Sequence, residues 1–403
     1  MQQRTDALTM GTRPSGTLLV GLLMGLVALF VTAPAYASHR PVLGGGSGFA
    51  TTRPTATGGA SASGEFVSAK APPAPAQALA ATSGTLPQFG TQFHGMWSSY
   101  TDKQRAMVLD RLKANGATTV RLDVSWAMLQ PKSATFDSWG TGFVTRVLKM
   151  ITDRGLQPMV MVWLTPSWVT GSTDDRVPPT GAVQLAQWQT FLKDAAGRFP
   201  QVRDWEIWNE PNHNDFMRGA DPTVYADVLA AGYRGIKAGN PSARVVFAGT
   251  QFVDVPWIEK ALRAGAAGMY DVMGVHPYMA VGNLAPTASD DGSIWRMRHV
   301  PVLRKAMLAA GDDKPIWFTE FGWRAGSIGK ANWQLGVDQN TQAKYLADTL
   351  SMVRSEWPYV TRVYWYRELA DNNTANASGY GLVLPNGSVK PALSQIPGIY
   401  AAG

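Results

Sequence analysis

The feature that most constrains the fold of this sequence is a regular alternation of short apolar runs with longer amphipathic runs after residue 87. The short runs have the composition of buried strands, whereas the longer runs repeat their apolar residues with the period of a helix. We expect strands at residues 88–94, 118–123, 158–163, 202–209, 244–250, 270–276, 315–320 and 362–366. Eight such repeats predict an α/β fold of the (β/α)8 or TIM barrel class in a single domain.

Helix start and stop signals lie between the predicted strands. Thr101 and Gln104 form a capping-box pattern, and Asn115 followed by glycine is typical of the end of that helix. Asp221 followed by Pro222 predicts the start of a later helix, because proline is well tolerated at the first helical position. The sequence also lacks the glycine fingerprint of an open dinucleotide-binding sheet, which favours the closed barrel.

The N-terminal residues resemble an export signal. Arg4 and Arg13 precede an apolar run at residues 18–31, and the A-Y-A triplet at residues 35–37 matches a cleavage site. We expect a signal peptide at residues 1–37, and then a secreted, extracellular or cell-wall-associated protein without stable membrane insertion. The alternative is a retained anchor, although the run is shorter than the about 20 apolar residues that a membrane span needs.

Residues 38–85 consist mainly of Ala, Gly, Ser, Thr and Pro, a composition that predicts a disordered linker before a folded domain at residues 86–403. A net charge of +7 on 403 residues does not imply a nucleic-acid partner. The absence of cysteine excludes disulfides and thiolate metal sites, and the five histidines form no metal-binding motif. We therefore expect neither a metal nor a cofactor.

Two carboxylates occur in matching contexts at the ends of predicted strands. The stretch W-E-I-W-N-E-P-N at residues 205–212 reads as a buried strand that Pro211 ends, which places Glu210 at its carboxyl-terminal mouth. A lone carboxylate there could be an exposed strand end. Glu320, in W-F-T-E-F-G-W, closes a second apolar strand in the same way. Because the carboxyl ends of barrel strands face one cavity, the two predict a pair suited to acid–base chemistry.

Other strand ends carry polar or aromatic side chains that could line the same cavity. A lone histidine is more often a satisfied core residue and a lone tryptophan more often packing, so core packing remains an alternative for several of them. The candidates are His94, Arg121, Trp126, Trp163, Asn209, His276, Tyr278 and Trp365.

These residues resemble a known group. The motifs W-N-E-P (208–211), T-E-F-G (319–322), H-P-Y (276–278) and V-R-L-D (120–123) are similar to those of the clan of retaining (β/α)8 glycoside hydrolases. Within the clan, the chain most resembles the family of β-xylosidases, α-L-iduronidases and exopolysaccharide endoglycosidases, and the cellulase and β-mannanase family is the alternative. The lack of a downstream β-sandwich favours a single-domain, endo-acting enzyme.

The resemblance implies a role for each carboxylate and for its neighbours. Glu210 would be the acid/base and Glu320 the nucleophile, and Asn209 would bind the 2-hydroxyl of the sugar. Arg121 and Tyr278 would lie near the nucleophile and keep it ionised.

The remaining candidates would line the sugar-binding pocket. Trp365 would form the floor under the reacting ring, and His276 would line the same pocket. Trp126 and Trp163 would be further platforms. His94, at the end of the first predicted strand, is a further candidate for substrate binding.

The expected function is that of a monomeric, secreted glycosidase that cleaves β-O-glycosidic bonds in a polysaccharide or oligosaccharide. Two alternatives remain open at this point. One is a catalytically weak, carbohydrate-binding wall protein, and the other is a transglycosylase that remodels glycans with the same residues.

Overall fold

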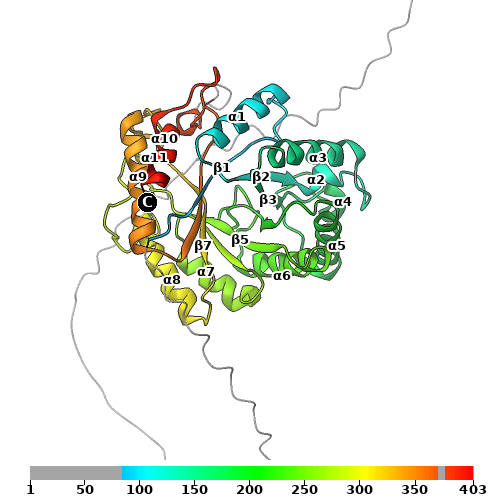
Figure 1. Cartoon of the computed structure of the whole chain (residues 1–403). Helices are drawn as coiled ribbons and strands as arrows, with labels where there is room; N and C mark the ends of the chain where they lie inside the picture. Colours follow the sequence, from blue (N-terminus) through cyan, green and yellow to red (C-terminus); the bar gives the residue numbers. More distant parts are fainter. Residues whose placement is uncertain (1–83, 371–376, 403) are drawn as a thin grey trace, which may run out of the picture. The chain divides into compact units, whose positions relative to one another are not determined.

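The computed structural model describes residues 84–370 and 377–402, and within them eight parallel strands close into a barrel in sequence order (Figure 1). The predicted signal peptide and the linker up to residue 83 lie outside the described residues. The strands are β1 Gln88–Gln92, β2 Thr119–Ser125, β3 Gln157–Trp163, β4 Asp204–Ile207, β5 Arg244–Gln251, β6 Val272–His276, β7 Ile316–Phe321 and β8 Val360–Trp365. The predicted (β/α)8 barrel is confirmed, and each strand overlaps its predicted range.

Helices follow the strands and form a ring around them (Figure 1). Those of eight or more residues are α1 Asp102–Ala114, α3 Ser138–Thr152, α5 Gly181–Arg198, α6 Pro222–Gly239, α8 Val300–Ala309 and α9 Gln339–Glu356. Shorter ones are α2 Trp126–Leu129, α4 Ser167–Thr170, α7 Val255–Ala261, α10 Pro391–Ser394 and α11 Ile396–Ala401. None of the helices in the described part of the chain is both long and apolar enough to span a membrane.

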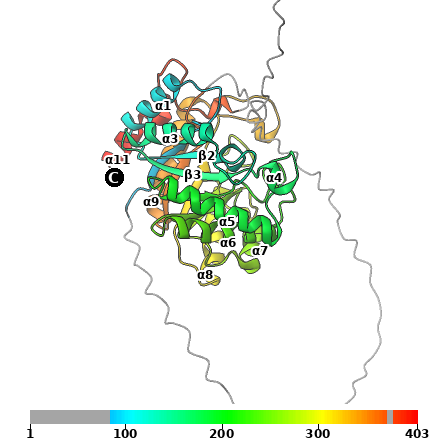
Figure 2. The same cartoon turned by 90° about the vertical axis from the view of Figure 1, so that its right-hand side faces the viewer.

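Local sequence explains where these helices begin and how closely they pack. Thr101 and Gln104 form the predicted capping box at the start of α1, and Asp221 caps α6 by accepting a hydrogen bond from the backbone N–H of Thr223. Helices α5 and α6 run side by side on the outside of the barrel (Figure 2). A Cβ atom at Gly235 would lie 2.4 Å from the carbonyl oxygen of Gln189, so a larger residue could not fit between the two helices.

The inside of the barrel has an apolar lower layer and a polar upper layer. The lower layer is a small cluster of inward-facing side chains: Met159, Val246, Val272, Trp317 and Tyr364. Beside them, in register with Met159, Asp204 pairs through its carboxylate with Arg362 at 2.7 Å and with Arg244 at 2.7 Å. The amino-terminal end is therefore filled and closed, which leaves the carboxyl-terminal end of the strands for a site.

An irregularity in β7 changes which side chains face the barrel interior. The register of β7 against β8 shifts between Phe318 and Phe321. Both phenylalanines pack outside the barrel, Phe318 against Trp357 and Phe321 against Trp365. Trp317 and Thr319 face the interior at alternate positions, so regular alternation would turn Glu320 outward. Because the register shift inserts an extra residue before the outward-facing Phe321, Glu320 faces the cavity as well.

Candidate active site

Glu210 owes its position to an unusual backbone segment after β4. Trp208 and Glu210 both have positive φ angles, of 79° and 40°, which L-residues adopt at a cost of about 1–3 kcal/mol each. Hydrogen bonds from Trp208 N to Val162 O (2.9 Å) and from Glu210 N to Gly249 O (3.1 Å) hold this segment between β3 and β5. The turn places the carboxyl group of Glu210, 4% exposed, over the end of the barrel.

Glu320 reaches the same cavity from β7 and has two hydrogen-bond donors. Arg121 Nη1 donates to its Oε1 atom at 2.6 Å, and the hydroxyl of Tyr278 donates to its Oε2 atom at 3.0 Å. Both oxygens of the carboxylate are therefore engaged. This arrangement favours the ionised form of Glu320 and fixes its orientation.

Arg121 links several strands through one buried guanidinium group. Besides Glu320, it donates to Glu206 Oε2 at 2.6 Å, to Gln92 Oε1 at 2.7 Å and to Asn209 Oδ1 at 2.8 Å. Glu206 is itself fully buried in β4 and accepts a further bond from the backbone N–H of Gly249 at 3.0 Å. One side chain of β2 therefore fixes the relative positions of groups on β1, on β7, on β4 and on the segment after β4.

The two carboxyl groups experience different electrostatic environments. Burial raises the pKa of Glu210 well above its usual value, and the charge of Glu320 raises it further. Burial also raises the pKa of Glu320, but Arg121 and the Tyr278 hydroxyl oppose that shift. At neutral pH the proton shared by this pair therefore belongs on Glu210, with Glu320 ionised.

His276 contacts the carboxyl group of Glu210. The Nδ1 atom lies 2.9 Å from Glu210 Oε1, and Gln251 Nε2 donates to the other oxygen at 3.4 Å. Burial and the charge of Arg121 lower the pKa of His276 well below its usual value, so the ring is neutral. Its position depends on Gly249, where a Cβ atom would lie 2.2 Å from the imidazole Nε2 atom.

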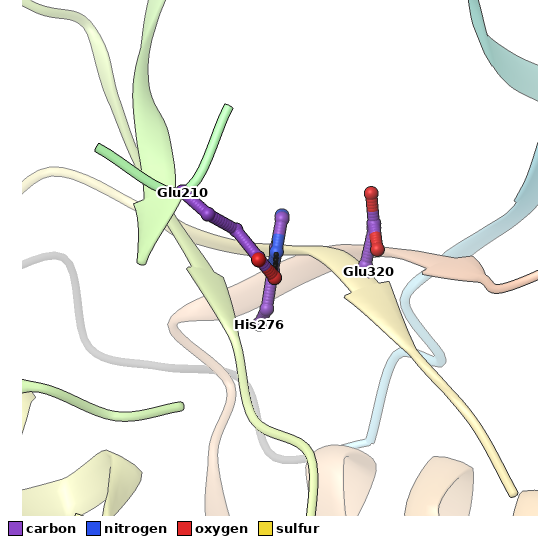
Figure 3. Close-up of side chains that lie close together, drawn as sticks. All are labelled: Glu210, His276 and Glu320. Carbon is purple, nitrogen blue, oxygen red and sulfur yellow. Dashed lines mark hydrogen bonds and ion pairs between the residues drawn. The ribbon is translucent and has the colours of Figure 1, made fainter. Parts of the chain in front are cut away.

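Figure 3 shows the side chains of Glu210 and His276 meeting, with the Glu320 carboxylate beside them. One donor atom from each of the three residues lies within 4.8 Å of the others. By distance alone these atoms could hold a metal ion. The guanidinium of Arg121, 2.6 Å from Glu320, places a fixed positive charge at the same point and opposes a second cation.

A second hydrogen-bonded group lies on the β1 and β8 side of the barrel mouth. The backbone N–H of His94 donates to Glu368 Oε1 at 2.8 Å, and its Nδ1 atom lies 3.0 Å from Oε2. Tyr100 also donates to Glu368. Although burial acts to raise the pKa of Glu368, His94 and Arg367 bring it down to about 2.

Comparison with known proteins gives this site its context. Residues 79–365 match the model of the family described as Cellulase (glycosyl hydrolase family 5). The chain belongs to this family of glycoside hydrolases. No curated protein matches the family 5 chain.

Solved structures similar to this fold include members of glycoside hydrolase families 39 and 5. A family 39 glycoside hydrolase from Bacteroides cellulosilyticus WH2 has a TM-score of 0.62 at 22% identity, over 78% of this chain and 64% of that one. A monomeric β-xylosidase from Caulobacter crescentus CB15 gives 0.56 at 19%, over 78% and 68%. A GH5_18 protein from Streptomyces cattleya, in complex with Manβ1-4GlcNAc, gives 0.60 at 16%, over 78% and 80%.

The predicted membership of the clan of retaining (β/α)8 glycoside hydrolases is confirmed. Of the two families that the sequence motifs resemble, the family model supports the cellulase family, which was the alternative. The family 5 chain spans 64% of the length of the family 39 structure from Bacteroides cellulosilyticus. At 22%, 19% and 16% identity, these likenesses show the fold alone.

The structure brings most of the predicted site residues of the family 5 chain together. Asn209, Arg121, Tyr278 and His276 all lie within hydrogen-bond reach of the carboxyl pair or of each other. Trp163 is partly buried at the end of β3. It shares the inward face with its register partner Ser125, so it lines the mouth of the barrel.

Two predicted platforms are placed elsewhere. Trp365 is fully buried, its indole N–H donates to Tyr380 O, and its ring packs against Phe321 outside the barrel. It therefore cannot be the floor of a sugar pocket, because strand alternation turns it away from the cavity. Trp126, the first residue of α2, is also fully buried and packs against α5, with its ring centroid 5.1 Å from that of Trp188.

Several residues of the site were not predicted from the sequence. Tyr366, one position after Trp365, faces the cavity, and its ring lies 6.4 Å from that of Tyr278 and 5.6 Å from that of His94. Glu206 could have been found from alternation, because it lies on the same face of β4 as the inward-facing Asp204. The others are Gln92, Asp123, Gln251 and Glu368.

Proposed function

We propose that this family 5 chain is a secreted, monomeric, retaining glycosidase that hydrolyses β-O-glycosidic bonds in a polysaccharide or oligosaccharide. Glu210 is the acid/base and Glu320 the nucleophile. The observation that carries the proposal is their spacing, since an oxygen of one lies within 4.8 Å of an oxygen of the other. Retaining enzymes place the carboxyl groups about 5–5.5 Å apart, whereas inverting enzymes leave about 6.5–9.5 Å for a water molecule.

In the first step, a carboxylate oxygen of Glu320 attacks the anomeric carbon while the carboxyl proton of Glu210 transfers to the departing oxygen. The bond between the anomeric carbon and the leaving group breaks, and a glycosyl ester of Glu320 forms. The ester no longer carries the negative charge that raises the pKa of Glu210. That pKa therefore falls, and Glu210 can act as the base.

In the second step, Glu210 removes a proton from water, which attacks the anomeric carbon and releases Glu320. The sugar leaves with the anomeric configuration that it had in the substrate. His276, neutral and 2.9 Å from Glu210, keeps the carboxyl group oriented through both steps. Because Asn209 Oδ1 accepts from Arg121, the amide N–H₂ of Asn209 is the part left to bind the 2-hydroxyl.

The β-linkage is supported by the names of structurally similar proteins. They include a β-xylosidase, an exo-β-1,4-mannosidase from Opitutaceae bacterium strain TAV5 and the complex with Manβ1-4GlcNAc. A protein that only binds carbohydrate is not favoured, because the two carboxyl groups differ in pKa as a working acid and nucleophile must. No observation on the described residues singles out transglycosylation.

The test of this function is a reducing-end assay of the purified protein on β-glucans, xylans, mannans, galactans and bacterial exopolysaccharides, followed by proton NMR of the first product. We expect hydrolysis with retention. An inverted anomer appearing first would exclude Glu320 as the nucleophile.

Two variants separate the roles of the carboxyl groups. Glu320→Ala should lose all hydrolysis, with azide restoring an inverted product. Glu210→Ala should keep its first step on activated aryl glycosides, and azide should restore turnover with retention. Glu356→Ala, at an exposed pair with Arg298, is the matched control and should behave as wild type. Near-wild-type activity of Glu210→Ala on a polysaccharide would place the acid elsewhere.

Secretion is tested separately from activity. N-terminal sequencing of material from the culture medium should begin near Ser38, after the A-Y-A triplet. Recovery of the intact chain from membranes would instead indicate a retained anchor.

A further inference from the structure

Asp123 is a buried acidic residue at the barrel mouth that the mechanism above does not use. It is 6% exposed, and its Oδ1 atom is buried with no hydrogen-bond partner among the described residues. A buried carboxyl oxygen without a partner is costly unless a ligand supplies the missing donor. The Oδ1 atom of Asp123 is therefore available to accept a hydrogen bond from a ligand bound at the barrel mouth.

Strand register places this carboxyl group in the cavity. Asp123 pairs with Met161, which pairs with Glu206, and Glu206 bonds to Arg121 inside the barrel. Neighbours in register on parallel strands share a face, so Asp123 faces inward. It lies two residues beyond Arg121 toward the mouth, which is about 6.6 Å at the usual rise of a strand. The carboxyl group of Asp123 therefore lies just above the hydrogen bonds that Arg121 makes, on the side of the barrel mouth.

The position relative to Glu210 identifies which part of a substrate would meet Asp123. Glu210 contacts Gln251 of β5 and His276 of β6, so the leaving group that it protonates lies toward those strands. In a closed barrel of eight strands in sequence order, β1 and β2 lie opposite β5 and β6. Asp123 and His94 therefore face the sugar that Glu320 attacks rather than the leaving group.

His94 and the groups around it complete this wall. Its Nδ1 atom is engaged by Glu368, which leaves Nε2 without a hydrogen bond to any described residue. Its ring lies 4.1 Å from that of Trp97 and 5.6 Å from that of Tyr366, so aromatic faces flank the polar atoms. Such a combination of an aromatic surface and a few polar groups suits a sugar ring with its hydroxyls at the edge.

We propose that Asp123, assisted by His94, selects the sugar that binds beside the catalytic pair by accepting hydrogen bonds from free hydroxyl groups of that ring. The inference rests on the proposed glycosidase function and adds the class of sugar. The unpartnered carboxyl oxygen of Asp123 faces this position, so the carboxylate of a uronate bound there would meet a like charge. The preferred substrates are therefore neutral sugars with free hydroxyls on the side away from the scissile bond.

The test compares wild type, Asp123→Ala and the isosteric Asp123→Asn on aryl β-glycosides of the preferred sugar and on its monodeoxy analogues. In wild type, loss of one particular hydroxyl should lower kcat/KM by at least ~100-fold, because the site is built to bond it. Asp123→Ala should lower kcat/KM on the parent sugar by a similar factor and on that analogue by less than ~3-fold, since the interaction is already absent. Asp123→Asn keeps an acceptor oxygen, so its kcat/KM on the parent sugar should lie between those of wild type and Asp123→Ala.

Asp110→Asn, in an exposed pair with Arg154, is the control and should keep the wild-type pattern. Thermal melts of each variant separate misfolding from altered specificity. If the Asp123 variants discriminate among the analogues as wild type does, the inference is wrong while the glycosidase function stands. If wild type hydrolyses no glycoside, the proposed function fails and this inference fails with it.

Discussion

Arg121 Nη1 donates a hydrogen bond of 2.6 Å to Glu320, whereas Glu210 meets the neutral imidazole of His276 at 2.9 Å. One carboxyl group therefore has a permanent positive charge beside it and the other has an uncharged partner. Since burial affects both, this difference decides which of the two holds the proton. The asymmetry lies in the partners of the carboxyl groups rather than in the carboxyl groups themselves.

Replacing Arg121 by lysine should lower kcat/KM by at least ~100-fold, because a single ammonium group cannot reproduce four hydrogen bonds of a guanidinium. The weaker contact should also raise the pKa of Glu320. Since the enzyme needs Glu320 ionised, the rising, acidic limb of the pH–rate profile should move to higher pH. Arg154→Lys, at the surface, is the control. An unchanged profile would contradict the role of Arg121.

Glu210→Gln should stabilise the fold at neutral pH while it abolishes activity on polysaccharides. A carboxyl group whose pKa is raised in the folded state contributes stability that is fully present below its unfolded pKa, about 4.3, and is lost as pH rises through the folded pKa. The melting temperature of Glu210→Gln minus that of wild type should therefore grow between pH 4 and pH 8. Glu356→Gln, an exposed control, should give a flat difference, and a flat difference for Glu210→Gln would refute the raised pKa.

Gly249→Ala should disturb catalysis without touching a catalytic group. The added methyl would lie 2.2 Å from His276 Nε2 and 2.5 Å from Thr319 Oγ1, so the imidazole must move and its bond to Glu210 is lost. We expect kcat to fall on the order of 10- to 100-fold, in the range of lost orientation of a catalytic group. Gly142→Ala, where the added methyl meets nothing within 4 Å, should remain fully active. Wild-type kcat for Gly249→Ala would show that His276 does not position the acid.

Substitution of Trp365 should mainly lower stability, whereas substitution of its neighbour Tyr366 should mainly lower activity. Trp365→Ala removes a fully buried ring from the packing outside the barrel and should cost about 3–5 kcal/mol of stability. Tyr366→Ala should instead lower kcat/KM on glycosides by more than its effect on the melting temperature explains, because its ring faces the cavity. Denaturant unfolding and steady-state kinetics of the two variants test this contrast. Full activity of Tyr366→Ala would show that its ring does not contact the substrate.

Hydrophobic patterning was sufficient to predict the barrel, because each strand is a short apolar run and some of the helices between them have a clear start signal, as at Thr101 and Asp221. The same reasoning failed at Trp365, where an error of one residue moves a side chain to the other face of a strand. Glu320 faces inward only because β7 changes register between Phe318 and Phe321. A register shift of this kind depends on packing against β8, so the sequence of β7 alone does not reveal it.

Partners distant in sequence were the other part of the site that could not be predicted. His94 and Glu368 are 274 residues apart and meet only because β1 and β8 pair when the barrel closes. Likewise, Arg121 was placed near the nucleophile through family resemblance, but its bonds to Gln92 and Glu206 depend on closure. The positive φ angles of Trp208 and Glu210 also follow from this context, since neither residue type favours them.

The anchoring of Arg121 also bears on how this scaffold could be altered. Its four hydrogen bonds join side chains at or just beyond the ends of the strands, and none of them goes to the longer loop segments 165–179 and 281–293. Changes within those segments leave the four bonds of Arg121 in place, provided that the ion pair of Asp174 with Arg218, in the segment after Glu210, is kept. Libraries randomised in these segments should therefore change how the outer parts of a glycan bind, while Asp123 on β2 still selects the sugar beside the catalytic pair and the bond-breaking chemistry is kept.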